Sequence, residues 1–183
     1  DEFSRVPFDE VSINKIVHAA GIPRGSFYQY FTDKNDVLCY LLSDFRQEIL
    51  GMARESMKKS GGDLFQLFSE LLDFTLAFAS QEQVNGFCRN LFADIRVNSS
   101  LYPKQPGKTA QEAAFRELSP LIDRGAYALQ GEDECFLLVK ILLLIYLDTV
   151  TNIFLNPQNA SVIRTQYDQT LALLKRFMTK EKE

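Results

Sequence analysis

The side chains best suited to recognising a ligand stand close together early in the chain. Arg24 can donate two parallel hydrogen bonds to a guanine edge or a phosphate. Ser26 offers a hydroxyl and Gln29 an amide, and Tyr28 and Tyr30 add two further hydroxyls. Such groups on one short segment suit a surface that reads base edges and holds a nucleic-acid backbone.

Two short helices joined by a tight turn are predicted to position these side chains. Apolar residues of the first helix recur at helical spacing, namely Ile13, Ile16, Val17 and Ala20. Ser12 suits its N-cap, and Gly21 stands where a left-handed residue would end it. Pro23 fits the first turn of the second helix, and Gly25 would let that helix approach a surface closely. This is the pattern of a helix-turn-helix, whose second helix enters a DNA major groove.

A third helix is predicted from Asp33 to about Lys59, where the break Ser60-Gly61-Gly62 follows. Asp33 suits its N-cap. Lys34 is a cation at a helix start, which the helix dipole disfavours, so we interpret it as part of a phosphate site. This helix would begin at the recognition surface and end in the next domain. A shift of the helix could therefore transmit a ligand-induced change from that domain to the recognition surface.

The run AAGIPRGSFYQYFTDKNDVL resembles the DNA-binding signature of the TetR/AcrR family of bacterial transcriptional repressors. In that family a glycine turn leads into [RK]-G-[ST]-[FL]-Y-x-[YH]-F and then a K-x-x-L helix start. The matching residues are Arg24, Gly25, Ser26, Phe27, Tyr28, Tyr30, Phe31, Lys34, Val37 and Leu38. The resemblance implies an all-α protein of about nine helices. Residues 1–45 would form a helix-turn-helix domain with a truncated first helix, and residues 46–183 a helical effector-binding and dimerisation domain.

The resemblance also implies a cytoplasmic repressor that binds a palindromic double-stranded DNA operator as a homodimer and is released by a small-molecule effector. We expect Arg24, Ser26 and Gln29 to contact base edges. The residues expected at phosphates or in close approach to the backbone are Ser12, Pro23, Gly25, Tyr28, Tyr30 and Lys34. No cofactor, metal or membrane partner is predicted.

Charge is in tension with this hypothesis, because DNA binding depends on phosphate neutralisation. The chain of 183 residues has a net charge of −4, and its first fifty residues hold five Lys and Arg against eight Asp and Glu. The motif itself is basic: between residues 12 and 34, Lys15, Arg24 and Lys34 stand against Asp33. A dimer would double this patch.

The remaining chain predicts helices over residues 63–80, 83–97, 109–129, 133–156 and about 160–179, with Pro120 kinking or splitting the third of these. Aromatic side chains in them would suit an apolar or aromatic effector, although core packing is the simpler interpretation of each. The predicted pocket residues are Phe74, Phe78, Cys88, Phe92, Tyr102, Phe115 and Tyr146, with Tyr102 as gatekeeper.

The segment 133–156 is long and apolar enough to raise the possibility of a membrane span. Lys140 and Asp148 near its middle argue against one. Burial by its own domain on one side and by a twin subunit on the other explains it better. With the last helix it would form a four-helix bundle across a two-fold axis, as the family resemblance implies. The predicted interface residues are Leu144, Leu147, Tyr167, Leu171, Leu174 and Met178.

Two alternatives to a DNA-binding regulator remain. Catalysis is disfavoured because His18 is the only histidine and no phosphate loop or metal spacing occurs, which leaves Asp94 and Asp148 as a hypothetical acid pair. The three cysteines are expected to be buried thiols. The second alternative is an all-α dimeric small-molecule-binding or adaptor protein without DNA binding.

Overall fold

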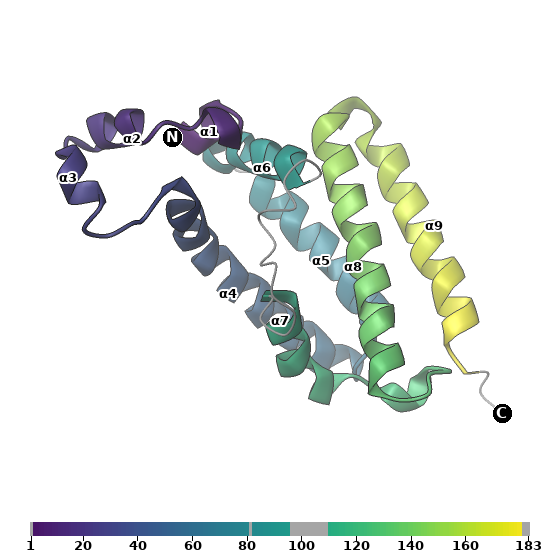
Figure 1. The fold of residues 1–183 in the computed structure, drawn as a ribbon. Coiled ribbons are helices and arrows are strands. Elements are labelled where there is room, and N and C mark those ends of the chain that lie inside the picture. The colour runs from purple at the N-terminus through teal and green to yellow at the C-terminus, as the bar shows by residue number, and fades with distance from the viewer. Residues whose placement is uncertain (1, 81, 96–109, 181–183) are drawn as a thin grey trace.

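The computed structural model describes residues 2–80, 82–95 and 110–180, which fold almost entirely into helices (Figure 1). Within these ranges β structure is confined to one isolated bridge between Tyr127 and Thr179. The predicted all-α fold is therefore confirmed. The α-helices are α1 (Glu2–Arg5), α2 (Ile13–Ala20), α3 (Arg24–Phe27), α4 (Lys34–Ser60), α5 (Leu64–Ala79), α6 (Glu82–Ile95), α7 (Ala110–Leu118), α8 (Glu132–Leu155) and α9 (Ala160–Met178).

The molecule has a small head and a larger helical body, each with its own core. The head comprises α1 to α3 and the start of α4, and lies at one end of the molecule in Figure 1. Its buried apolar residues are Phe3, Val11, Val17, Phe27, Val37 and Leu38. The body packs the rest of α4 with α5 to α9 around a second cluster of buried side chains. The head therefore has its own core, against which Phe87 and Leu91 of α6 also pack, and it presents α2 and α3 away from the body.

Helix α4 joins the two parts, and its ends follow from local chemistry. The Asp33 side chain accepts a hydrogen bond from the Asp36 N–H at 2.9 Å, which satisfies one of the free donors of the first turn. That bond, followed by a second one from Asn35, lowers the pKa of the Asp33 carboxyl. Gly61 ends the helix in the left-handed region, at φ 66°. The predicted long helix is thus confirmed.

Helices α5, α8 and α9 are tied together by tyrosine hydroxyls inside the body. The Tyr146 hydroxyl on α8 lies 2.6 Å from the Thr75 hydroxyl on α5. The Tyr167 hydroxyl on α9 donates to the Phe68 carbonyl oxygen at 2.8 Å. Burial raises the pKa of Tyr146 to about 12 and also raises that of Tyr167, so both hydroxyls remain neutral. These bonds fix which faces of α8 and α9 point inward.

The segment 109–129, which was predicted to be helical and kinked or split at Pro120, is split in the structure. Helix α7 ends at Leu118, and two short 3₁₀ turns follow, Ser119–Leu121 and Arg124–Ala126. Pro120 accounts for the first break because its ring cannot continue the α-helical hydrogen bonds. Pro120 therefore splits the segment rather than kinking it.

Within the described part of the chain, α8 is the one helix whose length and apolar composition would allow it to span a bilayer. Buried helices of globular proteins meet the same criterion.

Candidate nucleic-acid interface and internal cavity

The turn between α2 and α3 has the geometry expected of a helix-turn-helix. Gly21 adopts φ 66°, and its N–H donates to the His18 carbonyl oxygen at 3.2 Å. The Ile22 N–H donates to the Val17 carbonyl oxygen at 3.0 Å, which closes the end of α2. Pro23 differs slightly from expectation, because it is the N-cap residue of α3 and precedes the first helical turn.

Helix α3 is short, but its helical course continues beyond its last assigned residue. The N–H groups of Tyr30 and Phe31 both donate to the Phe27 carbonyl oxygen at 3.0 Å. Phe27 is only 3% exposed and packs against Phe31, with ring centroids 5.6 Å apart. These contacts anchor the inner face of α3 to the head core, so that its polar side chains face outward.

Arg24 is held in place on that outer face by two neighbours. Its guanidinium donates to the Asn14 side-chain oxygen at 2.8 Å and to the Tyr28 hydroxyl at 3.2 Å. It also lies 5.8 Å from the centre of the Tyr28 ring. Nothing in the motif predicted Asn14, which positions Arg24 from the preceding helix. Arg24 is therefore pre-oriented, with further donors still available.

The rest of the outer face is open. Ser26 is half-buried, Gln29 is exposed and Tyr30 is 78% exposed. A Cβ built on Gly25 would meet no atom within 4 Å, and Gly25 is not in the left-handed region. The chain's own packing therefore does not require glycine at this position, although glycine weakens a helix. The Ser12 side chain forms no capping hydrogen bond with α2.

Lys34 has a structural role that the sequence did not reveal. Its Nζ donates to the carbonyl oxygens of Phe8 and Asp9 at 2.8 and 2.9 Å, and lies 4.7 Å from the centre of the Phe8 ring. An ammonium group has three donors. Two of them bind the 3₁₀ turn Phe8–Glu10, which leaves one for an external acceptor.

A contact between α1 and α6 joins the head to the body at a second place besides α4. The Asn90 side-chain amide donates to the carbonyl oxygens of Phe3 and Val6 at 3.1 and 2.9 Å. A Cβ on Gly86 would lie 2.6 Å from the Ser4 carbonyl oxygen, so only glycine allows this approach. In the sequence, the only indications of this contact were a glycine and an asparagine four residues apart on α6.

The body contains an apolar cavity of about 270 Å³ between α4, α5, α7 and α8. Its walls are aliphatic and aromatic, and include Leu67, Leu71, Phe115 and Phe136. Its only polar lining residues in the described part of the chain are two basic ones, Arg46 on α4 and Lys140 on α8. Both residues are exposed.

Among the predicted pocket residues whose side chains the structure describes, only Phe115 lines this cavity. Phe74 and Phe78 stack instead on Phe45 of α4, with ring centroids 6.3 and 4.4 Å from it. Cys88 and Tyr146 are buried in the body core. The Phe92 side chain and Tyr102 lie outside the described residues.

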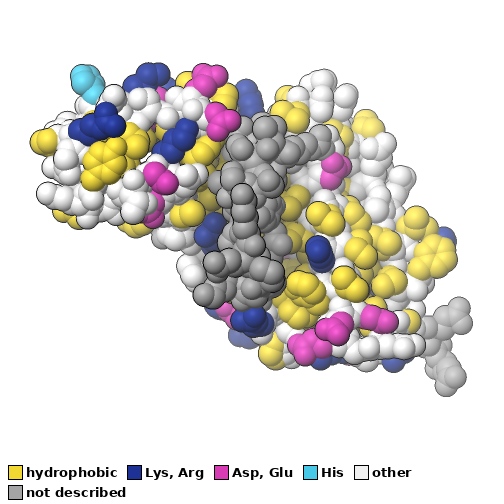
Figure 2. Space-filling view, in the orientation of Figure 1, with side chains coloured by type: hydrophobic (Ala, Val, Ile, Leu, Met, Phe, Trp, Pro, Cys, Tyr) yellow, Lys and Arg dark blue, Asp and Glu magenta, His cyan; other side chains and the backbone are white. Residues whose placement is uncertain are grey.

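The outer faces of α8 and α9 carry an exposed apolar stripe, and Figure 2 shows hydrophobic side chains gathered there. Its members on α8 are Leu137, Ile141, Leu144 and Leu155, and on α9 they are Val162, Leu173 and Phe177. Leu144 is 60% and Phe177 is 68% exposed. We call these seven residues the α8/α9 stripe. Exposed apolar area of this extent is typical of an interaction surface.

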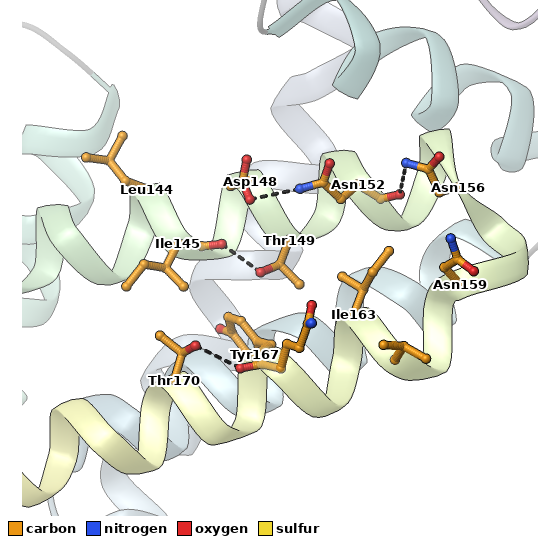
Figure 3. Close-up of a pocket in the computed structure, with 12 residues that line it drawn as sticks. Leu144, Ile145, Asp148, Thr149, Asn152, Asn156, Asn159, Ile163, Tyr167 and Thr170 are labelled. Atoms are coloured by element: carbon orange, nitrogen blue, oxygen red, sulfur yellow. Dashed lines mark hydrogen bonds between the residues drawn. The ribbon is translucent and has the colours of Figure 1, made fainter.

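An open polar groove of about 930 Å³ runs between α8 and α9 within the same surface (Figure 3). It is lined by Leu144 and Val162 together with amides and hydroxyls, among them Asn152 and Thr170. Figure 3 shows side chains of both helices facing each other across it. Asn152 donates to the Asp148 carboxylate at 2.8 Å.

The structure corrects part of the predicted dimer interface. Tyr167 is 2% exposed and bonds to Phe68 of α5, and Leu171 is buried in the body core of the same protomer. Leu147, Leu174 and Met178 are half-buried against the body core. Leu144 is the one predicted interface residue that belongs to the exposed stripe.

The cysteines also differ in part from expectation. Cys88 and Cys135 are buried, and burial raises both thiol pKa values, that of Cys88 to about 11. Cys39 was expected to be buried but is exposed on α4. No cluster of metal-binding side chains occurs among the described residues.

Comparison with known proteins supports the same interpretation of both parts of the chain. Residues 1–41 match the family model described as bacterial regulatory proteins, tetR family. Residues 63–176 match the model described as tetracyclin repressor-like, C-terminal domain. A crystal structure of a TetR family transcriptional regulator from Chloroflexus aurantiacus J-10-FL is similar, with 22% identity and a TM-score of 0.50 over 99% of this chain and 89% of that one. At that identity the likeness concerns the fold. No curated protein matches the chain.

Proposed function

Because this chain belongs to the TetR family of bacterial DNA-binding transcriptional regulators, we propose that it is a repressor whose homodimer binds a palindromic operator and leaves it when an effector binds. Regulators of this family are generally not enzymes. Residues 1–45 would be the DNA-binding domain and residues 46–183 the effector-binding and dimerisation domain. The observation that carries the proposal is the outer face of α3, which is polar, pre-oriented and open at Gly25.

Each recognition helix would enter one major groove, so that a dimer would read two half-sites one helical turn apart. We assign base contacts to Arg24, Ser26 and Gln29. Phosphate contacts would come from Ser12, Tyr28, Tyr30 and Lys34. Gly25 would let α3 approach the DNA closely, and Pro23, the N-cap residue of α3, completes the proposed DNA-binding set. Lys34 would use the single donor that its internal contacts leave free. The basic residues of the motif would supply the phosphate neutralisation that the acidic chain otherwise lacks.

The α8/α9 stripe would form the dimer interface. A two-fold interface uses the same surface of both subunits, and the stripe lies on two neighbouring helices, as a four-helix bundle requires. The polar groove beside it would be buried with the stripe. Its amides both donate and accept hydrogen bonds, so they can pair with their own copies across a two-fold axis.

Effector binding would act on the head through α4, because that helix both lines the cavity and begins in the head. The contact between Asn90 and α1 gives the head a second support. A ligand changes DNA affinity only if it binds the two arrangements of the heads differently. The separation of the two recognition helices is the quantity that would change.

The test is fluorescence anisotropy of the full-length protein on DNA from upstream of its own gene, across a salt series and beside a scrambled duplex. Selective binding of two subunits per site, with a negative salt slope, is the expected result. A folded dimer that binds both duplexes equally weakly would contradict the proposal. It would favour the small-molecule-binding or adaptor protein, for which the net negative charge of the first fifty residues is the specific observation.

A further inference from the structure

The cavity between α4, α5, α7 and α8 combines apolar walls with two basic side chains, and this combination specifies a ligand. Resting on the proposed function, we propose that the effector is a small apolar carboxylate. Its apolar body would fill the cavity, and its carboxylate would lie at the rim between Arg46 and Lys140.

The first argument is charge. The basic side chains Arg54, Arg124, Arg164 and Lys175 of the body each pair with a carboxylate. Arg46 and Lys140 have no such partner among the described residues, as is also true of Lys59 and Arg176, but only Arg46 and Lys140 of these four border the cavity. Two cations with no carboxylate partner in the described part of the chain favour an anion at the rim and repel an amine, and they offer a neutral ligand no opposite charge.

The second argument is size and polarity. A volume of about 270 Å³ corresponds to about nine water-sized atoms at roughly 30 Å³ each. Apart from Arg46 and Lys140, the described walls offer an apolar ligand body dispersion contacts and no side-chain hydrogen-bond partner. A carboxylate on a chain of about nine carbons, or on one ring with a short alkyl tail, fits both conditions.

The third argument is the position of the two cations. Arg46 belongs to α4, which begins in the head, whereas Lys140 belongs to α8, which carries the α8/α9 stripe. A carboxylate held by both would fix α4 relative to the helix proposed to form the dimer interface. A carboxylate bound in this way would therefore affect the orientation of the head. A ligand that contacts only the apolar walls would not connect α4 to α8 through a charged group.

Direct binding tests the ligand class without DNA. Isothermal titration of the full-length protein would compare decanoate, 4-propylbenzoate, 1-decanol and decylamine below their aggregation concentrations. We expect the affinity for at least one carboxylate to be about tenfold or more higher than the affinity for the alcohol, and the affinity for the amine to be the lowest. The two carboxylates distinguish a straight chain from a ring. An alcohol or amine that binds as tightly as its carboxylate, or no binding of either carboxylate, would overturn the proposal.

Variants locate the site. Arg46→Gln and Lys140→Gln should each weaken carboxylate binding about fivefold, and the double variant should remove the preference over the alcohol. Lys58→Gln removes an exposed cation of α4 outside the cavity and should change nothing. Ala114→Leu adds side-chain volume at the cavity wall and should weaken the binding of every ligand. Binding that survives all the cavity variants would place the ligand elsewhere and overturn the assignment.

The anisotropy assay keeps this proposal separate from the proposed function. If the carboxylate binds but leaves the operator complex intact, the proposed ligand class is supported and the proposed release of DNA by the effector is refuted. If the protein binds its operator selectively but binds no carboxylate, the regulator stands and the ligand class fails.

Discussion

Replacing Gly25 with alanine should stabilise the protein and weaken its binding to DNA, two effects that ordinary packing would not combine. Alanine is more favourable than glycine within a helix by about 0.5–1 kcal/mol. The added methyl group meets no atom of the chain within 4 Å, so no clash offsets this gain. The free energy of unfolding should rise by that amount, and Tm by about 1–4 °C.

The same methyl group would lie on the face of α3 that we propose enters the major groove. If it costs each head about 1 kcal/mol by displacing one hydrogen-bonded contact, the dimer loses about 2 kcal/mol, or roughly 30-fold in affinity. Chemical denaturation measures the first effect and fluorescence anisotropy on the operator measures the second.

Gly51→Ala is the matched control, because Gly51 lies within α4 and a Cβ there also meets nothing within 4 Å. It should raise stability by a similar amount and leave DNA binding unchanged. Operator affinity of Gly25→Ala equal to that of the wild-type protein would refute the placement of α3 against DNA.

Four further outcomes are expected. Arg24→Ala should relax sequence preference by about 1–3 kcal/mol at one base pair in a binding-site selection assay; uniform weakening at every sequence would make Arg24 a phosphate contact. Lys34→Ala should lower the free energy of unfolding by about 1–2 kcal/mol through its lost carbonyl contacts. It should also reduce the salt slope of DNA binding by about one per subunit, whereas an unchanged slope would leave Lys34 a purely structural role. Leu144→Glu should produce folded monomers in sedimentation velocity, and a persistent dimer would move the interface away from the α8/α9 stripe. At pH 8 an alkylating reagent should label Cys39 in the native protein but not Cys88, whose pKa is raised to about 11; equal labelling would contradict the burial of Cys88.

The sequence predicted the elements whose signals are local. The cap at Asp33, the left-handed Gly21 and the break at residues 60–62 each depend on a few adjacent residues. The helix-turn-helix was predicted for the same reason, because its turn and buried phenylalanine are encoded within one short run. Pro120 was recognised as a breaker, but the 3₁₀ turns after it depend on contacts with the rest of the body.

Predictions that depended on which helix faces which were less successful. Helix α9 is apolar on two sides, so periodicity alone could not show that Tyr167 faces inward and Phe177 outward. The buried bond from Tyr167 to the Phe68 carbonyl decides between them, and Phe68 is distant in sequence. The lining of the cavity could not be predicted for the same reason, because it comes from four separate helices. Of its aromatic residues in the described part of the chain, only Phe115 was predicted.

The close approach of Ser4 to Gly86 limits how this protein can be recombined with its relatives. A designer who exchanges the first 45 residues for the head of another regulator would keep Gly86 and Asn90 but remove the backbone surface that they fit. In the chimaera the head and the body would each fold, but the contact between α1 and α6 would be lost. The head would then be connected to the body through α4 alone and its orientation would vary. A working chimaera would therefore have to inherit its α6 residues from the same parent as its head, so that the unit of exchange is discontinuous in sequence.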